Sequence, residues 1–428
     1  MTYTETIAFL FEQLPMFTKQ GKSAYKENLD NTLALADFWG KPHRDLKVIH
    51  IAGTNGKGSV SHTLASVFQT AGYKTGLYTS PHLYDFRERI KVDGQMISKK
   101  GVSDFVKKSM KVIETLKPSF FELTTTMAFE WFRSQKVDIA IVEVGLGGRL
   151  DCTNIVNPLL SVITNISYDH TDILGKTLEL IAREKAGIIK HKIPVVVGQS
   201  NPETDPVFKE FALKNEAELI FADKNLSVIH SRADSSYQTF SVYKNHQPAY
   251  LDIKIDLLGN YQRKNIVTIL QCIEILDKIG YRFSKDIIYN GLRDAAKSTG
   301  LNGRWQLLKN EPLIVCDTAH NPDGILQVVD QIKQQTYKNL YIVLGMVNDK
   351  DISKVLSILP WEAHYIFTQA SIPRALNATE LRNKAQEFNL RGEVVPNVKD
   401  AYRLARKKAK KGDMIYIGGS TFVVAEIG

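Results

Sequence analysis

The sequence contains no apolar run long enough to cross a bilayer, and its first residues, MTYTETIAFLFEQL, lack the basic region and apolar core of a signal peptide. We therefore expect a cytoplasmic protein without a membrane partner. Cysteine is also scarce: Cys152, Cys272 and Cys316 are odd in number, and none of their spacings suits a metal site. This argues against a disulfide framework or a zinc site. The cysteines are predicted to be small buried residues, with a reactive thiol as the alternative.

Aromatic residues are not interleaved with Lys and Arg, although the net charge is positive, 55 − 46 = +9. The one dense basic run, ARKKAKK at 405–411, is predicted to be the solvated face of a late helix. The pattern therefore argues against a nucleic-acid partner. A positive net charge also suits a polyanionic small substrate, or simply favours solubility.

Near-continuous apolar runs recur through the first part of the chain. They are KVIHIAG (47–53), KTGLYTSP (74–81), VDIAIVEVG (137–145), PLLSVITNI (158–166) and IPVVVG (193–198). Such runs are typical of parallel strands buried on both faces, and the helical stretches between them make βαβ units. Because 428 residues are too many for one ordinary core, an α/β protein of two or three domains is predicted.

The pattern changes after about residue 203. Short alternating segments between about 203 and 258 predict a small antiparallel meander at the edge of the first domain. The stretch 298–304 contains glycines and no apolar periodicity, so it is predicted to be a linker. Strand and helix patterns then alternate again, as in a second, smaller doubly wound domain. The predicted domains are therefore 1–297 and 305–428.

The strongest local signal is GTNGKGS, residues 53–59, which follows an apolar strand and precedes a helix. A glycine-rich turn there lets backbone N–H groups and the helix N-terminus face a phosphate. Lys57 supplies a mobile cation, and the Ser59 hydroxyl can bind a phosphate or a magnesium ion. Gly58 stands between the two, so the spacing departs from the common P-loop, and a glycine turn with a surface lysine is the alternative. The expected nucleotide contacts are Thr54, Asn55, Gly56, Lys57, Gly58 and Ser59.

GTNGKGS resembles the ATP site of the Mur-type ligase superfamily, and its GKGS ending resembles the folylpolyglutamate synthase/dihydrofolate synthase branch. The resemblance continues, in order, through YTSPH with FRERI, FFELTT, VEVGLGGRLD, ITNISYDH, REKAGIIK, GNYQRKN, NGR, DTAHNPDG, GMVNDKD and GGS. It implies a P-loop Mur-ligase-type central domain followed by a Rossmann-like glutamate-ligase domain. It also implies an ATP-dependent ligase that adds L-glutamate to folates or dihydropteroate in folate biosynthesis.

Possible metal ligands follow several of the predicted strands. Ser80 closes KTGLYTS, Glu143 closes VDIAIVE, and Asp169-His170 follows LLSVITNI. Because the carboxyl ends of parallel strands meet at one edge of a sheet, these residues are expected near the P-loop. The resemblance implies that Ser80 and Glu143 hold one magnesium ion, and that Glu143 and His170 hold a second one. A loop histidine satisfied by its neighbours is the alternative for His170.

Lys185, in REKAGIIK, matches a lysine that is carbamylated in the family and helps to place the second magnesium ion. Carbamylation requires a neutral amine, which burial would favour. An ordinary lysine on a helix surface is the alternative. Potassium is a further candidate ion.

The resemblance assigns other roles by position. Asn265, Arg304 and Asp317 correspond to nucleotide contacts, although NGRW replaces the family's usual proline-glycine-arginine here. His320 and Ser420 are candidates for holding phosphate, the incoming glutamate or the intermediate. The expected pterin contacts are Phe121, Glu122, Thr124, Arg149 and Asp151.

Three stretches carry less signal. The aromatic pair Phe120-Phe121 fits a core position equally well. The segment GKSAYKENLD (21–30) does not show the glycine-leucine-rich loop of the family. Asp349-Lys350-Asp351 is predicted to be a solvated loop without a specific role.

The expected reaction transfers the γ-phosphoryl group of ATP to a substrate carboxylate, and the amino group of glutamate then attacks the acyl phosphate. Magnesium and Lys57 would neutralise charge on the transferred group. The expected catalytic residues are Lys57, His170, Lys185, Asp317 and His320.

The ligase is expected to be a monomer. Two alternatives stand beside this prediction. A cell-wall Mur ligase would need a nucleotide-sugar domain, for which the 52 residues ahead of Gly53 leave little room. A catalytically inactive nucleotide-binding module is the other alternative, and the competent residue at every ligand position argues against it.

Overall fold

The computed structural model describes residues 1–16, 28–348 and 350–428. Its internal contacts divide the chain into two units. The first contains Met1–Ser167, Thr171–Asp256 and Gln262–Leu301, and the second contains Tyr168–His170, Leu257–Tyr261 and Asn302–Gly428. No helix in these described ranges is long and apolar enough to cross a membrane.

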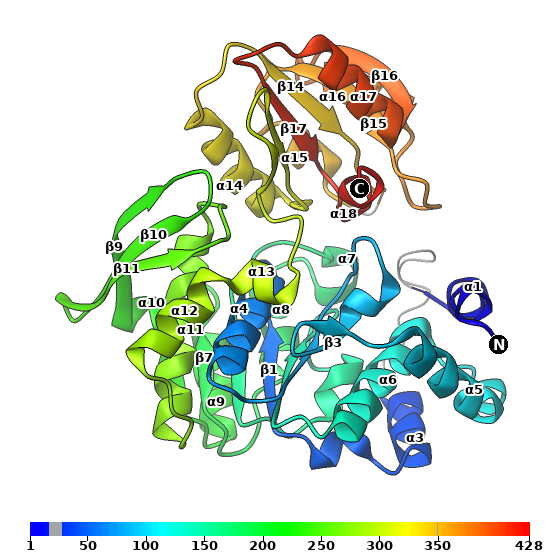
Figure 1. Cartoon of the computed structure of the whole chain (residues 1–428), viewed down its shortest axis with the longest axis vertical. Helices are drawn as coiled ribbons and strands as arrows, with labels where there is room; N and C mark the ends of the chain where they lie inside the picture. The colour runs from blue at the N-terminus through cyan, green and yellow to red at the C-terminus, as the bar shows by residue number, and fades with distance from the viewer. Residues whose placement is uncertain (17–27, 349) are drawn as a thin grey trace. The chain divides into compact units, whose positions relative to one another are not determined.

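The first unit is built on an eight-stranded sheet in the order β4-β3-β2-β5-β1-β6-β7-β8, of which β1, β3 and β7 are labelled in Figure 1. The strands are β1 Val48–Ala52, β2 Thr75–Tyr78, β3 Ile90–Val92, β4 Gln95–Met96, β5 Ile139–Glu143, β6 Leu160–Ile163, β7 Val195–Val197 and β8 Leu219–Phe221. The run from β2 to β8 is parallel, whereas β3 and β4 pair antiparallel at one edge. Every residue of β1, β2, β5, β6 and β7 is buried. The predicted α/β class is confirmed, because these apolar runs form central parallel strands.

Helices cover both faces of this sheet, as two apolar clusters show. One cluster joins α1, α5 and α6 to β1, β2 and β5, and the other joins α8 and α9 to β1, β6 and β7. The helices and 3-10 turns of the unit are α1 Tyr3–Gln13, α3 Asp30–Phe38, η2 Pro42–Asp45, α4 Lys57–Thr70, η3 Phe86–Arg89, α5 Lys99–Leu116, α6 Phe120–Gln135, η4 Cys152–Ile155, α7 Thr171–Leu174, α8 Leu178–Ala186, α9 Asp205–Lys214, α10 Ala222–Asn225, α11 Gln262–Lys278, α12 Lys285–Arg293 and α13 Ala295–Thr299. The helix that follows the P-loop, α4, is buried from Gly58 to Phe68 because α11, α12 and α13 pack against it.

A separate three-stranded antiparallel sheet follows, in the order β11-β10-β9. Its strands are β9 Leu226–Ala233, β10 Gln238–Lys244 and β11 Gln247–Ile255. The predicted meander therefore exists, but its expected start near residue 203 is wrong. The chain first forms α9 and then β8, whose apolar residues Leu219–Phe221 pair in parallel with β7 and extend the large sheet.

The second unit contains a six-stranded sheet in the order β12-β13-β17-β14-β15-β16, parallel except for β12. Its strands are β12 Gln306–Lys309, β13 Leu313–Cys316, β14 Leu340–Leu344, β15 His364–Gln369, β16 Gly392–Asn397 and β17 Met414–Gly418. Its helices are α14 Pro322–Lys333, α15 Ile352–Leu356, α16 Ala378–Gln386, α17 Val398–Lys408 and α18 Thr421–Glu426. This alternation of strands and helices agrees with the doubly wound pattern predicted for this part of the chain. The edge strands β12 and β16 are half-exposed and contain no fully buried run.

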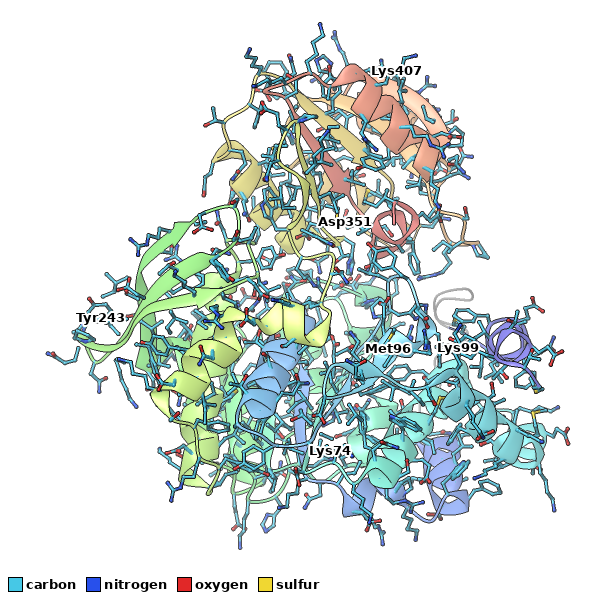
Figure 2. The ribbon with its side chains drawn as sticks, viewed as in Figure 1. Lys74, Met96, Lys99, Tyr243, Asp351 and Lys407 are labelled. Carbon is cyan, nitrogen blue, oxygen red and sulfur yellow. The ribbon has the colours of Figure 1, made fainter. Side chains whose placement is uncertain are left out.

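The basic run at 405–411 closes α17 and points mainly to solvent. Ala405 is buried against the sheet, whereas Arg406, Lys407 and Lys408 are exposed, and Lys407 projects outward in Figure 2. Cations at a helix C-terminus are favoured by the helix dipole. This arrangement agrees with the predicted solvated face.

The cysteines form no disulfide. Cys272 and Cys316 are buried, as predicted, whereas Cys152 is only partly buried. Burial of the thiols raises the pKa of all three, so none of them has the character of a reactive thiolate.

Candidate active site

Two glycines of the P-loop cannot be replaced without a clash. Gly53 has φ +143° and Gly56 has φ +86°, which is backbone that favours glycine. A Cβ on Gly53 would lie 1.9 Å from Thr164 Oγ1, and a Cβ on Gly56 would lie 2.5 Å from Asn265 Oδ1. The loop is therefore closely packed against its neighbours, and Asn265 lies beside it.

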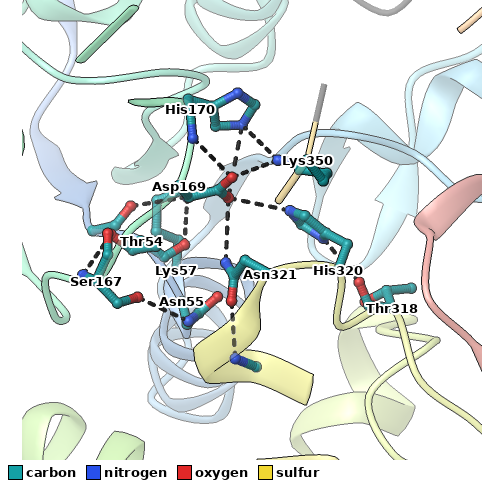
Figure 3. Close-up of polar contacts among 12 residues, drawn as sticks. Thr54, Asn55, Lys57, Ser167, Asp169, His170, Thr318, His320, Asn321 and Lys350 are labelled. Carbon is teal, nitrogen blue, oxygen red and sulfur yellow. Dashed lines mark hydrogen bonds and ion pairs between the residues drawn. The ribbon is translucent and has the colours of Figure 1, made fainter. Parts of the chain in front are cut away.

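The end of β6 holds the loop by polar contacts, shown in part in Figure 3. The Thr54 N–H donates to the Asn165 carbonyl at 2.9 Å, and the Asn55 N–H donates to Asn165 Oδ1 at 2.8 Å. Thr164 Oγ1 donates to the Asn55 carbonyl at 2.6 Å, and Thr54 Oγ1 bonds the backbone of Ser167. The first five residues of ITNISYDH, 163–167, thus hold GTNGKGS in place within the first unit.

Lys57 begins α4, and its side chain bends back over the loop. Its Nζ donates to the carbonyls of Gly53 at 3.0 Å and Thr54 at 3.2 Å. Ser59 lies two residues further and is buried, with its Oγ accepting from Gln262 Nε2 at 3.1 Å. A half-buried lysine at the N-terminus of a helix, beside a glycine-rich turn, is suited to bind phosphate.

Ser80, Glu143 and Lys185 also belong to this unit. Glu143 ends β5 with only 3% of its surface exposed, and its Oε2 accepts from the Ser80 N–H at 3.2 Å. Lys185, on α8, is 4% exposed, and its Nζ donates to the Gly53 carbonyl at 3.0 Å. The alternative of a surface lysine is therefore wrong. His170 belongs to the other unit and is described with it.

Arg89 is a buried residue of FRERI to which the sequence assigned no role. Its Nε donates to His82 Nδ1 at 2.8 Å, and its guanidinium lies 5.2 Å from the centre of the Phe120 ring. Burial lowers the pKa of Arg89, and the charge of Glu143 opposes that shift. Burial and then Arg89 lower the pKa of His82 to about 3. The only sequence signal for Arg89 is its place in the quoted motif FRERI.

Two of the expected pterin contacts have carboxylates that bond to backbone within the fold. Glu122 Oε2 accepts from the Ser119 N–H at 2.6 Å in a capping box of α6. Asp151 is buried and caps η4, and its Oδ2 accepts from the Leu146 N–H at 2.8 Å. Both carboxylates therefore stabilise local backbone.

The other expected pterin contacts are placed differently. The Phe121 ring packs so closely on Gly145 that a Cβ there would lie 2.3 Å from Phe121 Cζ. Thr124 is buried, with its Oγ1 at 3.3 Å from the Tyr78 hydroxyl. Arg149 is exposed and pairs with Glu184 at 2.8 Å. Among the five, Arg149 is the one exposed to solvent.

In the second unit, Asp317 follows β13 and is buried. Its carboxylate accepts from the Tyr261 hydroxyl at 2.7 Å, the Trp305 N–H at 2.6 Å and the Ala319 N–H at 2.7 Å. Burial raises the pKa of Asp317, although the Tyr261 hydroxyl and Arg304 oppose that shift. Ser420 caps α18 by accepting from the Phe422 N–H at 3.2 Å.

Asp169 is the centre of a second polar group in this unit (Figure 3). Its Oδ1 lies 2.5 Å from Lys350 Nζ, and its Oδ2 lies 3.3 Å from His320 Nε2 and 3.2 Å from Asn321 Nδ2. Lys350 Nζ is also 3.5 Å from His170 Nε2. Burial alone would raise the pKa of Asp169, but His170, Lys350 and His320 hold it well below its ordinary value.

The prediction of a solvated loop at 349–351 is wrong for Lys350, whose side chain is only 7% exposed. Asp351 is exposed and caps α15, and Asp349 lies outside the described residues, as do most of the residues of GKSAYKENLD. In the described ranges, no three His, Cys, Asp or Glu side chains gather in a way that could hold a metal ion. The expected magnesium ligands Ser80 and carbamylated Lys185 are not among these residue types.

Comparison with known proteins gives the class of protein to which this fold and this P-loop belong. The Mur ligase middle domain matches residues 51–272, and the Mur ligase glutamate ligase domain matches residues 303–421. The protein is therefore an ATP-dependent ligase with the two domains of a Mur ligase.

Individual relatives narrow the class to one family. The dihydrofolate synthase/folylpolyglutamate synthase of Bacillus subtilis (strain 168) is 33% identical over 415 residues, which is 95% of this chain and 95% of that protein. The structure of E. coli FolC in complex with DHPP and ADP matches with a TM-score of 0.86 at 28% identity, covering 100% of this chain and 97% of that one. Mycobacterium tuberculosis folylpolyglutamate synthase complexed with ADP and AMPPCP matches with a TM-score of 0.87 at 29% identity, covering 99% and 98%. The chain belongs to the folylpolyglutamate synthase/dihydrofolate synthase family, and the resemblance stated from the sequence is confirmed.

Proposed function

We propose that this protein uses ATP to add L-glutamate to the terminal carboxylate of folates, and also to dihydropteroate, in the cytoplasm and as a monomer. The observation that carries the proposal is the P-loop at the carboxyl end of β1, with Lys57 folded over it and Ser80, Glu143 and Lys185 in the same unit. The names of the relatives support both acceptors, because the Bacillus subtilis protein carries both activities in its name.

The first chemical step assigned to the P-loop is phosphoryl transfer to the acceptor carboxylate. The N–H groups at the start of α4 and the ammonium of Lys57 would bind the outer phosphates and offset the charge that develops on the transferred group. Asn265, Arg304 and Asp317 are assigned to the nucleotide. Gly53 and Gly56 admit no side chain, because Thr164 and Asn265 fill the space that a Cβ would need.

The residues of the first unit fit a magnesium ion. Magnesium prefers oxygen ligands and substrate phosphates, and the Ser80 hydroxyl and the Glu143 carboxylate supply oxygen donors at the carboxyl ends of β2 and β5. Glu143 and His170 are proposed to hold a second ion, which a carbamylated Lys185 would help to place. When bound, the ions would offset the mutual repulsion of phosphate and carboxylate.

The second unit is assigned to the incoming glutamate. His320 and Ser420 lie at the carboxyl ends of β13 and β17, where open α/β sheets bind ligands. Attack of the glutamate amine on the acyl phosphate forms the amide bond and releases phosphate. Lys350, Asn321 and His320 all contact Asp169, and we assign Lys350 and Asn321 to the same glutamate site. Phe121, Thr124 and Arg149 remain the proposed pterin contacts.

The test is release of phosphate from ATP with glutamate and one acceptor at a time. Tetrahydrofolate, dihydropteroate, a nucleotide-linked cell-wall peptide and no acceptor form the four arms. We expect release and amide formation with the first two acceptors only. Release with the cell-wall peptide alone would identify a different ligase, and binding of ATP without release in any arm would identify an inactive nucleotide-binding module.

A further inference from the structure

A histidine stands in the middle of β1, the strand that leads into the P-loop. His50 is fully buried, and its Nε2 lies 2.8 Å from Thr153 Oγ1 in η4. Thr153 Oγ1 in turn lies 2.5 Å from Asp151 Oδ1, and Asp151 Oδ2 accepts from the Leu146 N–H at 2.8 Å. A continuous row of buried hydrogen bonds therefore runs from β1 to the loop that contains GLGGRLD.

The position of the proton on His50 follows from its surroundings. His50 Nδ1 is buried and has no hydrogen-bond partner in the described part of the chain. A buried N–H without an acceptor is costly and rare, so the proton of a neutral ring belongs on Nε2. Burial and, to a smaller degree, Lys190 lower the pKa of His50 to about 3, which keeps the ring neutral. Nε2–H then donates to Thr153, and the Thr153 hydroxyl donates to Asp151.

The row ends at a loop that packs directly on α8. A Cβ on Gly148 would lie 2.7 Å from the Glu184 carbonyl oxygen and 3.0 Å from Lys185 Cα. The Arg149 N–H donates to the Glu184 carbonyl at 2.7 Å. The loop therefore rests on the backbone that carries Lys185.

Lys185 connects α8 back to the end of β1, because its Nζ donates to the Gly53 carbonyl at 3.0 Å. This closed series of contacts thus joins β1, η4, the loop 145–151 and α8, all within the first unit.

We propose that His50 is a positioning residue, which fixes Asp151 through Thr153 and thereby sets the loop 145–151 and Lys185 against the P-loop. The proposal rests on the proposed function, because it takes Lys185 and Arg149 as site residues. A core histidine that only fills space is the competing interpretation. The two interpretations differ in whether the Nε2 proton and the Thr153 hydroxyl affect activity as well as stability.

Matched substitutions separate these interpretations. Thr153→Ser keeps the hydroxyl, whereas Thr153→Val keeps the shape and removes it. His50→Gln keeps an N–H donor, whereas His50→Leu removes it. The double variant His50→Leu/Thr153→Val removes both polar groups and leaves no buried N–H without an acceptor, so it should fold at least as well as Thr153→Val alone.

We expect Thr153→Val to lower kcat/KM for the folate acceptor roughly tenfold, the effect of one lost hydrogen bond to a charged group, with KM for ATP unchanged. Thr153→Ser and His50→Gln should stay close to wild type. The double variant should recover its melting temperature but not kcat/KM. Recovery of both would overturn the proposal and leave His50 as a packing residue.

Two measurements do not depend on the reaction. Nitrogen NMR of the imidazole should show a neutral ring protonated on Nε2, and a ring protonated on Nδ1 would overturn the proposal. Amide exchange at Leu146 should be faster in Thr153→Val than in Thr153→Ser. If exchange and tautomer behave as expected but no folate acceptor is used, the proposed function is wrong and the positioning role stands.

Discussion

Lys350 Nζ lies 2.5 Å from Asp169 Oδ1, and the two side chains are 7% and 10% exposed. The residues are 181 positions apart in sequence, and the contact ties the short segment Tyr168–His170 into the second unit. His320 and Asn321 contact the other carboxylate oxygen. One buried acidic residue thus organises three of the proposed site residues.

Lys350→Met should therefore lower both activity and the stability of the second unit. The substitution leaves a buried carboxylate without its nearest cation, which costs about 3 kcal/mol. Urea denaturation followed by a probe in the second unit measures the loss, and exposed Lys333→Met is the control. The double variant Asp169→Asn/Lys350→Met should regain part of the stability. Equal stability of wild type and Lys350→Met would show that the ion pair is not formed in solution.

Lys57→Ala should remove turnover and leave the fold intact. The lysine lies half-buried at the start of α4 and donates to the P-loop carbonyls of Gly53 and Thr54, so its loss should leave the apolar core in place. We expect a fall in kcat of roughly 10³-fold, since a cation at the transferred phosphoryl group is lost. Lys407→Ala, at an exposed position of α17, is the matched control (Figure 2). Ordinary ligation by Lys57→Ala would contradict the role given to the P-loop.

Glu143→Gln should abolish magnesium-dependent activity. The amide has nearly the same shape and can still accept from the Ser80 N–H, so the fold should survive while one charged ligand is lost. Activity should fall roughly 100-fold or more at ordinary magnesium and rise in part when magnesium is increased. Glu114→Gln, exposed on α5, is the control. A variant that works at the same magnesium concentration as wild type would refute the metal role.

The sequence predicts the sheets well where a strand is fully buried. VDIAIVE and DMIYIGG read as strands because both faces of β5 and β17 are covered, so every residue is buried. The edge strand Gly392–Asn397 combines glycine, proline and exposed residues, and its pairing with β15 depends on tertiary contacts that no local pattern reveals. The same holds for Leu219–Phe221, which is too short to be told from a turn.

The site is predictable in part. The P-loop is contiguous, so spacing suffices to find it, whereas the contact of Lys350 with Asp169 joins distant segments and has no local signal. For Glu122, the sequence also indicates a structural role, because Ser119-x-x-Glu122 is a capping-box pattern. The backbone contacts of Asp151 are evident only from the structure.

Acid should destabilise the protein through His50, and His50→Gln should remove that part of the effect. The folded pKa is lowered to about 3, whereas an unfolded histidine titrates near about 6.5, so only the unfolded chain gains the proton between these values. The stability contribution is complete above about pH 6.5 and is lost as the pH falls toward 3. From pH 7.5 to 5.5, wild type should lose about 1.4 kcal/mol more than His50→Gln in urea denaturation. Equal losses would show that the imidazole is charged when folded or is never buried.

Lys185→Ala should be nearly inactive, and formate or acetate should restore part of the activity. The lysine is 4% exposed, and burial favours the neutral amine that carbon dioxide requires. Carbamylation replaces a cation with a carboxylate, and a small added carboxylate could fill the position that the alanine leaves open. Rescue should therefore saturate with the concentration of the added anion.

Lys192→Ala is the control, because Lys192 is exposed and lies seven residues after Lys185. This variant should keep its activity and show no response to formate. In wild type, labelled bicarbonate should give a carbamate carbon signal that is absent from Lys185→Ala. Rescue without that signal would mean that the anion only fills a cavity. An unmodified amine at Lys185, in active protein with magnesium bound, would refute the carbamate. The hydrogen bond to the Gly53 carbonyl would then be the role of the lysine, and the ligase assignment would be unaffected.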